Sequence, residues 1–251
     1  MEITAINNNL VKDTVKLQQK KYRQERNEFL LEGYKSVHEA YQSNIELKHV
    51  FVLKDKSEKY KFINRELILT NEAVLKKIST TDSSPEVVAV GVQPKQNFDK
   101  LKNSKKVVLL ENISDAGNLG TIIRSAAAFG VDTIVLYGDT IDLYNPKCVR
   151  ASVGNLWKIN IIQIKKFEDL SRYFVDFERV ATLPKTDNSV WLRDWCPKQK
   201  CLIMFGSEAD GLSDELKKYA TTNLTIEMST NVESLNLSTS ASIIMYLLSK
   251  V

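Results

Sequence analysis

The chain has 251 residues, of which 43% are hydrophobic and 26% charged, and its formal net charge is +4. This composition excludes a disordered chain, and the length suits one large or two small domains. The mild basic excess permits a nucleic-acid partner without requiring one. Because no stretch is long and apolar enough for a signal peptide or a membrane helix, we expect a soluble, cytoplasmic protein without membrane contact.

The first segment, from Asn7 to about Arg26, has apolar residues at helical spacing and predicts a basic helix. Its cations are Lys12, Lys16, Lys20, Lys21, Arg23 and Arg26. Two interpretations remain open at this point. The helix presents either a solvated face or a surface that contacts the phosphates of a nucleic acid.

Residues 27–95 alternate between strand and helix patterns. The expected strands are Phe29–Leu31, His49–Leu53, Glu66–Leu69 and Val87–Val90, and the expected helices run from Gly33 to Tyr41 and, after a cap at Asn71, to Ile78. Such alternation predicts a small α/β domain over residues 1–95. Residues 96–106 are rich in lysine and lack apolar periodicity, so we expect them to form a linker.

The remaining residues, 107–251, alternate in the same way. Strands are expected at residues 107–110, 133–136, 158–164, 179–182, 201–205 and 224–227, with helices at 118–129, 146–153, 212–219 and 234–248. The pattern predicts an α/β domain with an open, largely parallel sheet and helices on both faces. Domains of this kind bind ligands at the carboxyl ends of their strands.

The cysteines and histidines offer no metal site. Cys148, Cys196 and Cys201 form no pair with ligand spacing, and His38 and His49 lie far from them in the sequence. We therefore expect free thiols and no bound metal ion.

Three segments that follow predicted strands depart from ordinary patterning. The first spans residues 111–130, where a helix buries an apolar stripe and leaves Arg124 outside it. The second is Gly206–Leu212, whose two glycines predict a tight loop with backbone exposed to a ligand. The third, residues 226–238, is rich in polar residues yet leads into a very apolar helix. Taken singly, each segment has a simpler explanation. The first is compatible with a surface arginine, the second with a plain turn, and the third with helix caps.

Together, Asn118–Arg124, Gly206–Leu212 and Ser234–Ser238 resemble the three signature motifs of the SpoU/TrmH family of RNA ribose 2′-O-methyltransferases, part of the SPOUT superfamily. The motifs occur in the family's order and spacing, and the resemblance covers about residues 105–250. More loosely, Phe29–Lys35 (FLLEGYK) resembles part of the L30e-like substrate-binding domain that precedes many members.

The resemblance implies a C-terminal trefoil knot, a homodimer, and S-adenosyl-L-methionine as the cofactor. It assigns catalytic roles to Arg124, Asn118, Glu208, Ser234 and Asn236. It assigns contacts with the cofactor to Gly206, Ile226, Met228 and Leu235. Two residues depart from the family pattern, Glu227 where proline is usual and Thr230 where glycine is usual, and both leave the geometry of the cofactor loop open.

The sequence thus predicts S-adenosylmethionine-dependent 2′-O-methylation of a ribose in structured RNA. Ribosomal RNA is the expected substrate and transfer RNA the alternative. A non-catalytic RNA-binding module is a further alternative, because a small domain and lysines suffice to bind RNA. A dinucleotide-dependent enzyme is disfavoured, because the chain lacks the GxGxxG fingerprint.

Overall fold

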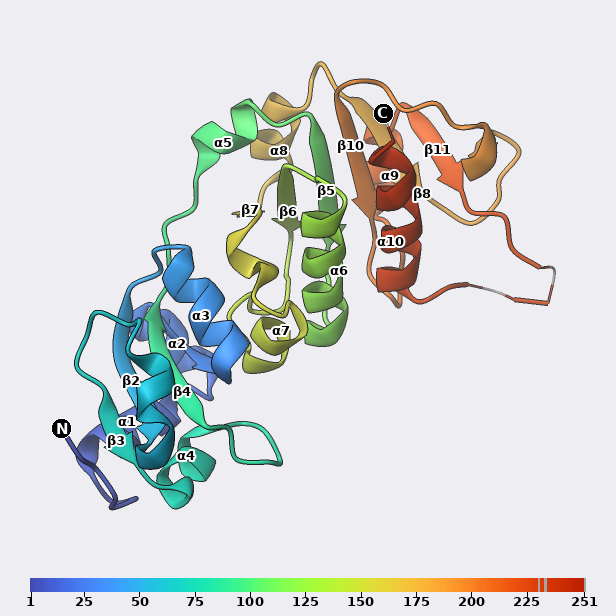
Figure 1. The fold of residues 1–251 in the computed structure, drawn as a ribbon. Coiled ribbons are helices and arrows are strands. Elements are labelled where there is room, and N and C mark those ends of the chain that lie inside the picture. Colours follow the sequence, from blue (N-terminus) through green and yellow to red (C-terminus); the bar gives the residue numbers. More distant parts are fainter. Residues whose placement is uncertain (230, 233, 251) are drawn as a thin grey trace. The chain divides into compact units, whose positions relative to one another are not determined.

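The chain folds into two compact units (Figure 1). The computed structural model describes residues 1–229, 231–232 and 234–250. The first unit comprises Met1–Lys95 and Asp142–Trp157, and the second comprises Gln96–Ile141 and the described residues from Lys158 onward. A stretch well inside the expected catalytic range therefore packs with the N-terminal residues.

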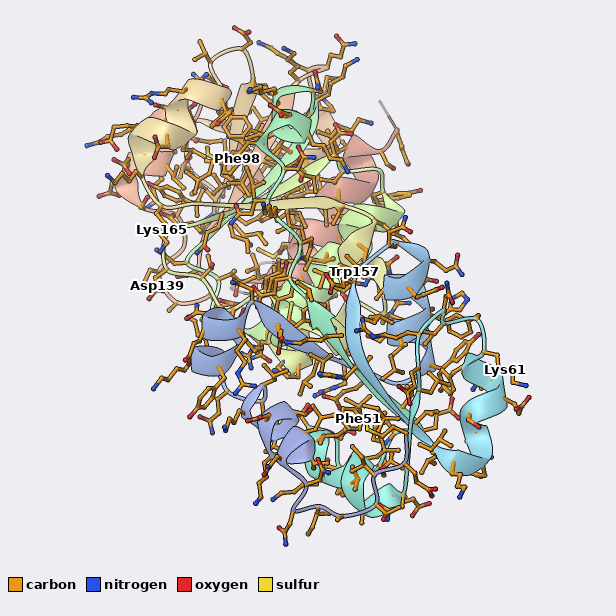
Figure 2. All side chains as sticks on the ribbon, turned by 90° about the vertical axis from the view of Figure 1, so that its left-hand side faces the viewer. Phe51, Lys61, Phe98, Asp139, Trp157 and Lys165 are labelled. Carbon is orange, nitrogen blue, oxygen red and sulfur yellow. The ribbon has the colours of Figure 1, made fainter. Side chains whose placement is uncertain are left out.

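The first unit is built on a mixed four-stranded sheet. In spatial order its strands are β1 (Glu28–Glu32), β4 (Val87–Val92), β2 (Leu47–Leu53) and β3 (Ile68–Thr70). The β1–β4 and β4–β2 pairs are antiparallel, and β2–β3 is parallel. Phe51, labelled in Figure 2, is fully buried in the core of this unit.

Helices complete the first unit. They are α1 (Asn9–Lys16), α2 (Lys20–Arg26), α3 (Tyr34–Gln42), η1 (Lys54–Tyr60), α4 (Glu72–Ile78), α7 (Pro146–Ala151) and η2 (Asn155–Trp157). The predicted cap of α4 is confirmed, since the Asn71 side chain accepts a hydrogen bond from the Val74 amide. The single helix expected between Asn7 and Arg26 is wrong, because the chain turns at residues 17–19 and forms two short helices.

Residues 142–157 are held in the first unit by buried ion pairs and aromatic contacts. Arg23 lies 2.6 Å from Asp142, with both side chains almost fully buried. Arg150 forms a second pair with the buried Glu32 at 3.1 Å. The Phe29 ring packs against Tyr144 and Trp157, a contact that apolar periodicity along the chain does not reveal.

The second unit contains a seven-stranded sheet in which every neighbouring pair is parallel. In spatial order the strands are β7 (Asn160–Ile164), β6 (Thr133–Tyr137), β5 (Lys106–Glu111), β10 (Cys201–Phe205), β8 (Glu178–Thr182), β11 (Thr222–Thr225) and β9 (Ser189–Trp191). The central strand β10 is apolar throughout because both of its faces are buried. The predicted parallel sheet is confirmed.

The second unit also contains helices before, between and after these strands. They are α5 (Phe98–Lys102), α6 (Ala116–Ala128), α8 (Phe167–Tyr173), η3 (Leu192–Asp194), α9 (Asp214–Tyr219) and α10 (Leu237–Leu248). The short α5 lies within residues 96–106 and buries Leu101 in the core. The last helix begins three residues later than expected, because Asn236 caps it.

Candidate active site

The three unusual segments follow strands β5, β10 and β11 of the second unit. Strands β5 and β10 are neighbours, and only β8 separates β10 from β11. Because all these strands are parallel, their carboxyl ends share one edge of the sheet, where α/β proteins build their ligand sites. Segments separated by about ninety residues in sequence thereby come together.

Hydrogen bonds join one side chain from each segment. Asn118 Nδ2 donates to Glu208 Oε1 over 2.8 Å, and Asn236 Nδ2 donates to Asn118 Oδ1 over 3.1 Å. Ser114 Oγ adds a longer contact of 3.4 Å to Glu208 Oε2. We call this series of hydrogen-bonded side chains, Asn236–Asn118–Glu208, the polar relay.

Helix caps position two members of the polar relay. Asp115 caps α6 and accepts a hydrogen bond of 2.7 Å from the Asn118 amide, which fixes Asn118 in the first turn. Asn236 caps α10, and its Oδ1 accepts from the amide and the hydroxyl of Ser238, over 2.9 and 2.6 Å. The cap commits the Asn236 oxygen to the helix, so its NH₂ group points to Asn118.

The polar relay therefore has a direction. Amide hydrogens of α10 donate to Asn236, Asn236 donates to Asn118, and Asn118 donates to the exposed carboxylate of Glu208. The positive end of a helix lies at the start of this series and a negative charge at its end. Hydrogen bonds in such a series polarise one another, and this series holds the Glu208 carboxylate in a fixed orientation.

The loop that carries Glu208 is fixed from the sheet side. Ser207 and Gly211 exchange two backbone hydrogen bonds of 3.1 Å across the loop. Below it, the buried carboxylate of Glu111, the last residue of β5, accepts a 2.7 Å hydrogen bond from the Ser213 amide at the start of α9. Glu111 is a supporting residue that the motif comparison did not single out.

The motif predicts that Gly206 leaves backbone exposed to a ligand, but the structure shows another reason for a glycine at this position. A Cβ atom there would lie 1.9 to 2.1 Å from backbone atoms of Gly211 and Leu212. The glycine is therefore needed by the closed loop itself, before any ligand is considered.

Arg124 and Ser234 lie outside the polar relay. Arg124 is exposed on α6, as its position outside the buried stripe predicts, and Ser234 is exposed just before the cap of α10. The helices α6 and α10 pack side by side, as Figure 1 shows, with a 2.7 Å hydrogen bond between Ser125 and Ser242.

The three apolar residues expected to contact the cofactor are each at least partly exposed. Ile226 follows β11 and is half-buried, Met228 is 38% exposed, and Leu235 precedes the α10 cap. Glu227 stands where the family pattern usually has proline, and its Oε1 lies 3.3 Å from Arg193 Nε. The second departure, Thr230, lies outside the described residues.

The strand order adds a segment that the sequence did not point to. Thr182 ends β8, which lies between β10 and β11, and Leu183 and Pro184 follow it. Thr182 Oγ1 donates to the Met204 carbonyl and the Leu183 amide donates to Leu224, so both neighbours hold this segment. Only the spatial neighbourhood of β8 could have identified it.

Two features are absent among the described residues. No group of three or more His, Cys, Asp or Glu residues there could hold a metal ion. Within the same residues, no helix is long and apolar enough to cross a membrane.

Comparison with known proteins matches residues 105–246 to the SpoU rRNA Methylase family and residues 8–89 to the MRM3-like substrate binding domain. The chain belongs to the SpoU rRNA methylase family. This membership confirms the resemblance carried by the three motifs, and with it the methyltransferase class and the S-adenosylmethionine cofactor.

Individual relatives match between about two thirds and the whole of this chain. A 23S rRNA guanosine 2′-O-methyltransferase of Bacillus subtilis is 28% identical and covers 98% of each protein. A 23S rRNA uridine 2′-O-methyltransferase of Streptomyces viridochromogenes is 30% identical over 66% of this chain and 60% of its own length. An S-adenosylmethionine-bound rRNA methyltransferase structure from Sinorhizobium meliloti is 30% identical with a TM-score of 0.87, covering 100% of this chain and 97% of that one.

The residues at the strand ends fit this cofactor. The exposed part of Met228, with half-buried Ile226 and Leu235, offers the apolar contact that an adenine ring needs. The closed loop after Gly206 follows β10 at the same edge of the sheet, and its backbone groups can read the polar edges of a ligand there.

Proposed function

We propose that this protein methylates the 2′-hydroxyl of a ribose in 23S ribosomal RNA. The named relatives from Bacillus and Streptomyces act on that RNA, and the substrate-binding domain match covers most of the first unit. The polar relay carries the proposal, because it unites all three family motifs in one chain of hydrogen bonds. A module that only binds RNA has no need of such an arrangement.

The proposed reaction depends more on alignment and charge stabilisation than on proton-transfer groups. The cofactor supplies an activated methyl group on a positively charged sulfur. A ribose hydroxyl is a weak acid, so the protein must align it and stabilise negative charge as it develops. The Arg124 guanidinium suits that role and can also bind the adjacent phosphate. It does not serve as a general base, because a guanidinium stays protonated in proteins.

The polar relay supplies orientation in this proposal. Glu208 presents a fixed acceptor for a hydroxyl or a cation of the bound substrates, and Asn118 and Asn236 keep it in place. Ser234 adds a hydroxyl beside the α10 cap. Gly206, Ile226, Met228 and Leu235 contact the cofactor, with the β8 end as a further wall.

We extend the proposal to a homodimer. Helix α10 buries Ala241, Ile244 and Met245 on one side and leaves Ile243 38% exposed and Tyr246 52% exposed on the other. Exposed apolar side chains on an otherwise packed helix are typical of a subunit interface. Light scattering at micromolar concentration should give twice the monomer mass of 28.5 kDa.

The same proposal includes the trefoil knot, a substrate-binding role for residues 1–95 and a cytoplasmic location, where ribosomal RNA is accessible. The residues 142–157 belong with the substrate-binding unit in this division, because they pack there.

The decisive experiment uses ribose-methylation mapping. Purified protein and S-adenosylmethionine are incubated with an unmodified 23S rRNA transcript and, separately, with unmodified transfer RNA transcripts. We expect one new 2′-O-methyl group at one 23S position and none in transfer RNA. Methylation confined to transfer RNA, or absent from every RNA although the cofactor binds, would overturn the proposal.

A further inference from the structure

The two N-terminal helices are held in place by a buried arginine. Arg23 of α2 is 2% exposed and pairs with Asp142, and it also donates to the carbonyls of Leu17 and Gln18 over 2.9 and 2.8 Å. These carbonyls form the turn between α1 and α2. Arg23 therefore fixes the angle between the helices and is removed from the set of cations that meet solvent.

A second residue of the same turn is anchored to α4. Gln18 Nε2 lies within 3.1 to 3.2 Å of three successive carbonyls, those of Lys77, Ile78 and Ser79. The helix pair is thus a rigid frame before any partner binds. A rigid frame lowers the entropy lost when its side chains meet a ligand.

The remaining cations of the helix pair form what we call the α1–α2 surface. It comprises Lys12, Lys16, Lys20, Lys21, Tyr22 and Arg26. Its five cations face two carboxylates, Asp13 and Glu25, which leaves a formal excess of three positive charges in a chain whose net charge is +4. The surface is therefore locally basic.

The pairing on this surface is incomplete. Lys16 and Arg26 share Asp13, at 2.8 and 3.4 Å, and the hydrogen bond from Lys16 is the main reason why the pKa of the Asp13 carboxyl is lowered. Lys12, Lys20 and Lys21 have no ion pair within the part of the chain that the structure describes. They are free to bind phosphates.

A tyrosine ring lies among these cations. Tyr22 is half-buried, and Lys16 Nζ, Lys21 Nζ and Arg26 Cζ lie 6.0, 5.8 and 5.9 Å from its ring centroid. These distances are at the outer limit of cation–π attraction, so the ring holds the three cations only weakly. Aromatic rings flanked by cations are the arrangement by which proteins stack on nucleotides while neutralising the backbone.

We propose that the α1–α2 surface binds the phosphodiester backbone of the RNA substrate, with Tyr22 stacking on a nucleotide between the bound phosphates. This inference rests on the proposed function for the identity of the RNA. Of the two interpretations left open for the basic segment, the proposal favours the surface that contacts phosphates. It differs in one respect, because Arg23 belongs to the rigid frame and the other cations belong to the binding surface.

The test compares two variants of the full-length protein that lose the same charge. The first, K12Q/K20Q/K21Q, neutralises the three unpaired lysines with a residue that favours helices equally well. The matched control, K54Q/K56Q/K61Q, neutralises three exposed lysines in and beside η1 of the same unit, where Figure 2 labels Lys61. Each control lysine already has an acidic partner, Glu2, Asp55 or Glu58.

Binding to an unmodified 23S rRNA transcript is measured by fluorescence anisotropy at several salt concentrations. The first variant should bind about 10- to 100-fold more weakly at 0.1 M salt, and its slope of log K against log salt should fall by about two to three. The control should lose less than about threefold. Equal losses in both variants would mean that net charge alone matters, and the proposal would be overturned.

Tyr22 gives an independent arm. Tyr22→Leu should weaken binding by about 5- to 100-fold, the range for one stacked base, whereas Tyr22→Phe should bind like the wild type. If the leucine variant binds RNA as tightly as the wild type, Tyr22 does not stack on a nucleotide and that part of the proposal is wrong. Calorimetry with S-adenosylhomocysteine should give wild-type affinity for every variant, which shows that the second unit is intact.

The outcomes separate this inference from the proposed function. Wild-type protein that binds the transcript through these residues but does not methylate it would refute the function and leave the surface standing. A triple-glutamine variant that binds and methylates like the wild type would refute the surface and leave the function standing.

Discussion

Asn118 is the middle member of the polar relay, and Asn118→Asp reverses one of its hydrogen bonds without changing its size. The wild-type NH₂ group donates to Glu208 over 2.8 Å. In the variant, two carboxylates meet at that distance. Two unit charges so placed repel by about 1.5 kcal/mol at the dielectric constant of water and by about 6 kcal/mol at an effective value of 20. Glu208 is exposed, so we expect the lower end, about 1 to 2 kcal/mol at pH 7.

The sign of the pH dependence follows from the new carboxyl. Its pKa is raised by the neighbouring negative charge, and its protonated form can again donate a hydrogen bond to Glu208. A group with a raised pKa in the folded state stabilises the protein at low pH, and this contribution is lost as the pH rises through that pKa. The stability deficit should therefore be small near pH 4 to 5 and largest at pH 7 and above.

Thermal unfolding from pH 4.5 to 8 tests this reasoning, with Asn64→Asp, an exposed position in the first unit, as the control for an added charge. At pH 7.5 the Asn118→Asp variant should melt about 3 to 6 °C below wild type. Its methyl transfer should fall by about 10²-fold, the scale for disturbing a key polar group in an active site. A melting temperature that follows the control at every pH would show that the polar relay is absent in solution.

Three further changes have distinct expected outcomes. Arg124→Ala should keep the fold and S-adenosylhomocysteine affinity but lower methyl transfer by about 10²-fold or more, so near wild-type turnover would refute its role. Gly206→Ala should weaken S-adenosylhomocysteine binding at least about tenfold in calorimetry, because its Cβ would overlap the loop backbone. The control Gly211→Ala should weaken binding less, because a Cβ there meets no atom, although the residue has a positive φ. Asp142→Ala leaves the buried guanidinium of Arg23 without its carboxylate partner, so chemical denaturation should show a loss of about 3 to 5 kcal/mol in the free energy of unfolding. A loss below about 1 kcal/mol would contradict the buried pair.

Much of the second unit could be predicted from the sequence because its signals are local. A fully buried parallel strand such as β10 is a continuous apolar run, and its predicted bounds, Cys201–Phe205, agree with the structure. Asn118, Glu208 and Asn236 stand in motifs with fixed spacing, so their assignment to one site needed only the order of the motifs.

The features that the sequence missed depend on contacts between distant residues. Arg23 looks like one cation among six, and only Asp142, more than a hundred residues later, shows that it is buried. The packing of residues 142–157 in the first unit has the same origin, because Phe29 contacts Tyr144 and Trp157. Local periodicity reports which face of an element is apolar, but not which element covers that face.

The polar relay also explains why amide side chains suit its inner positions. An asparagine can accept with its oxygen and donate with its nitrogen, so two in series pass on the direction set by the amides of α10. A carboxylate at Asn118 would accept from Asn236 but could not donate to Glu208, and an alkyl side chain would do neither. The acid is at the exposed end of the polar relay, and the helix is at the other. The order of residue types along the chain of hydrogen bonds follows from the need to present one fixed negative charge without placing a second charge behind it.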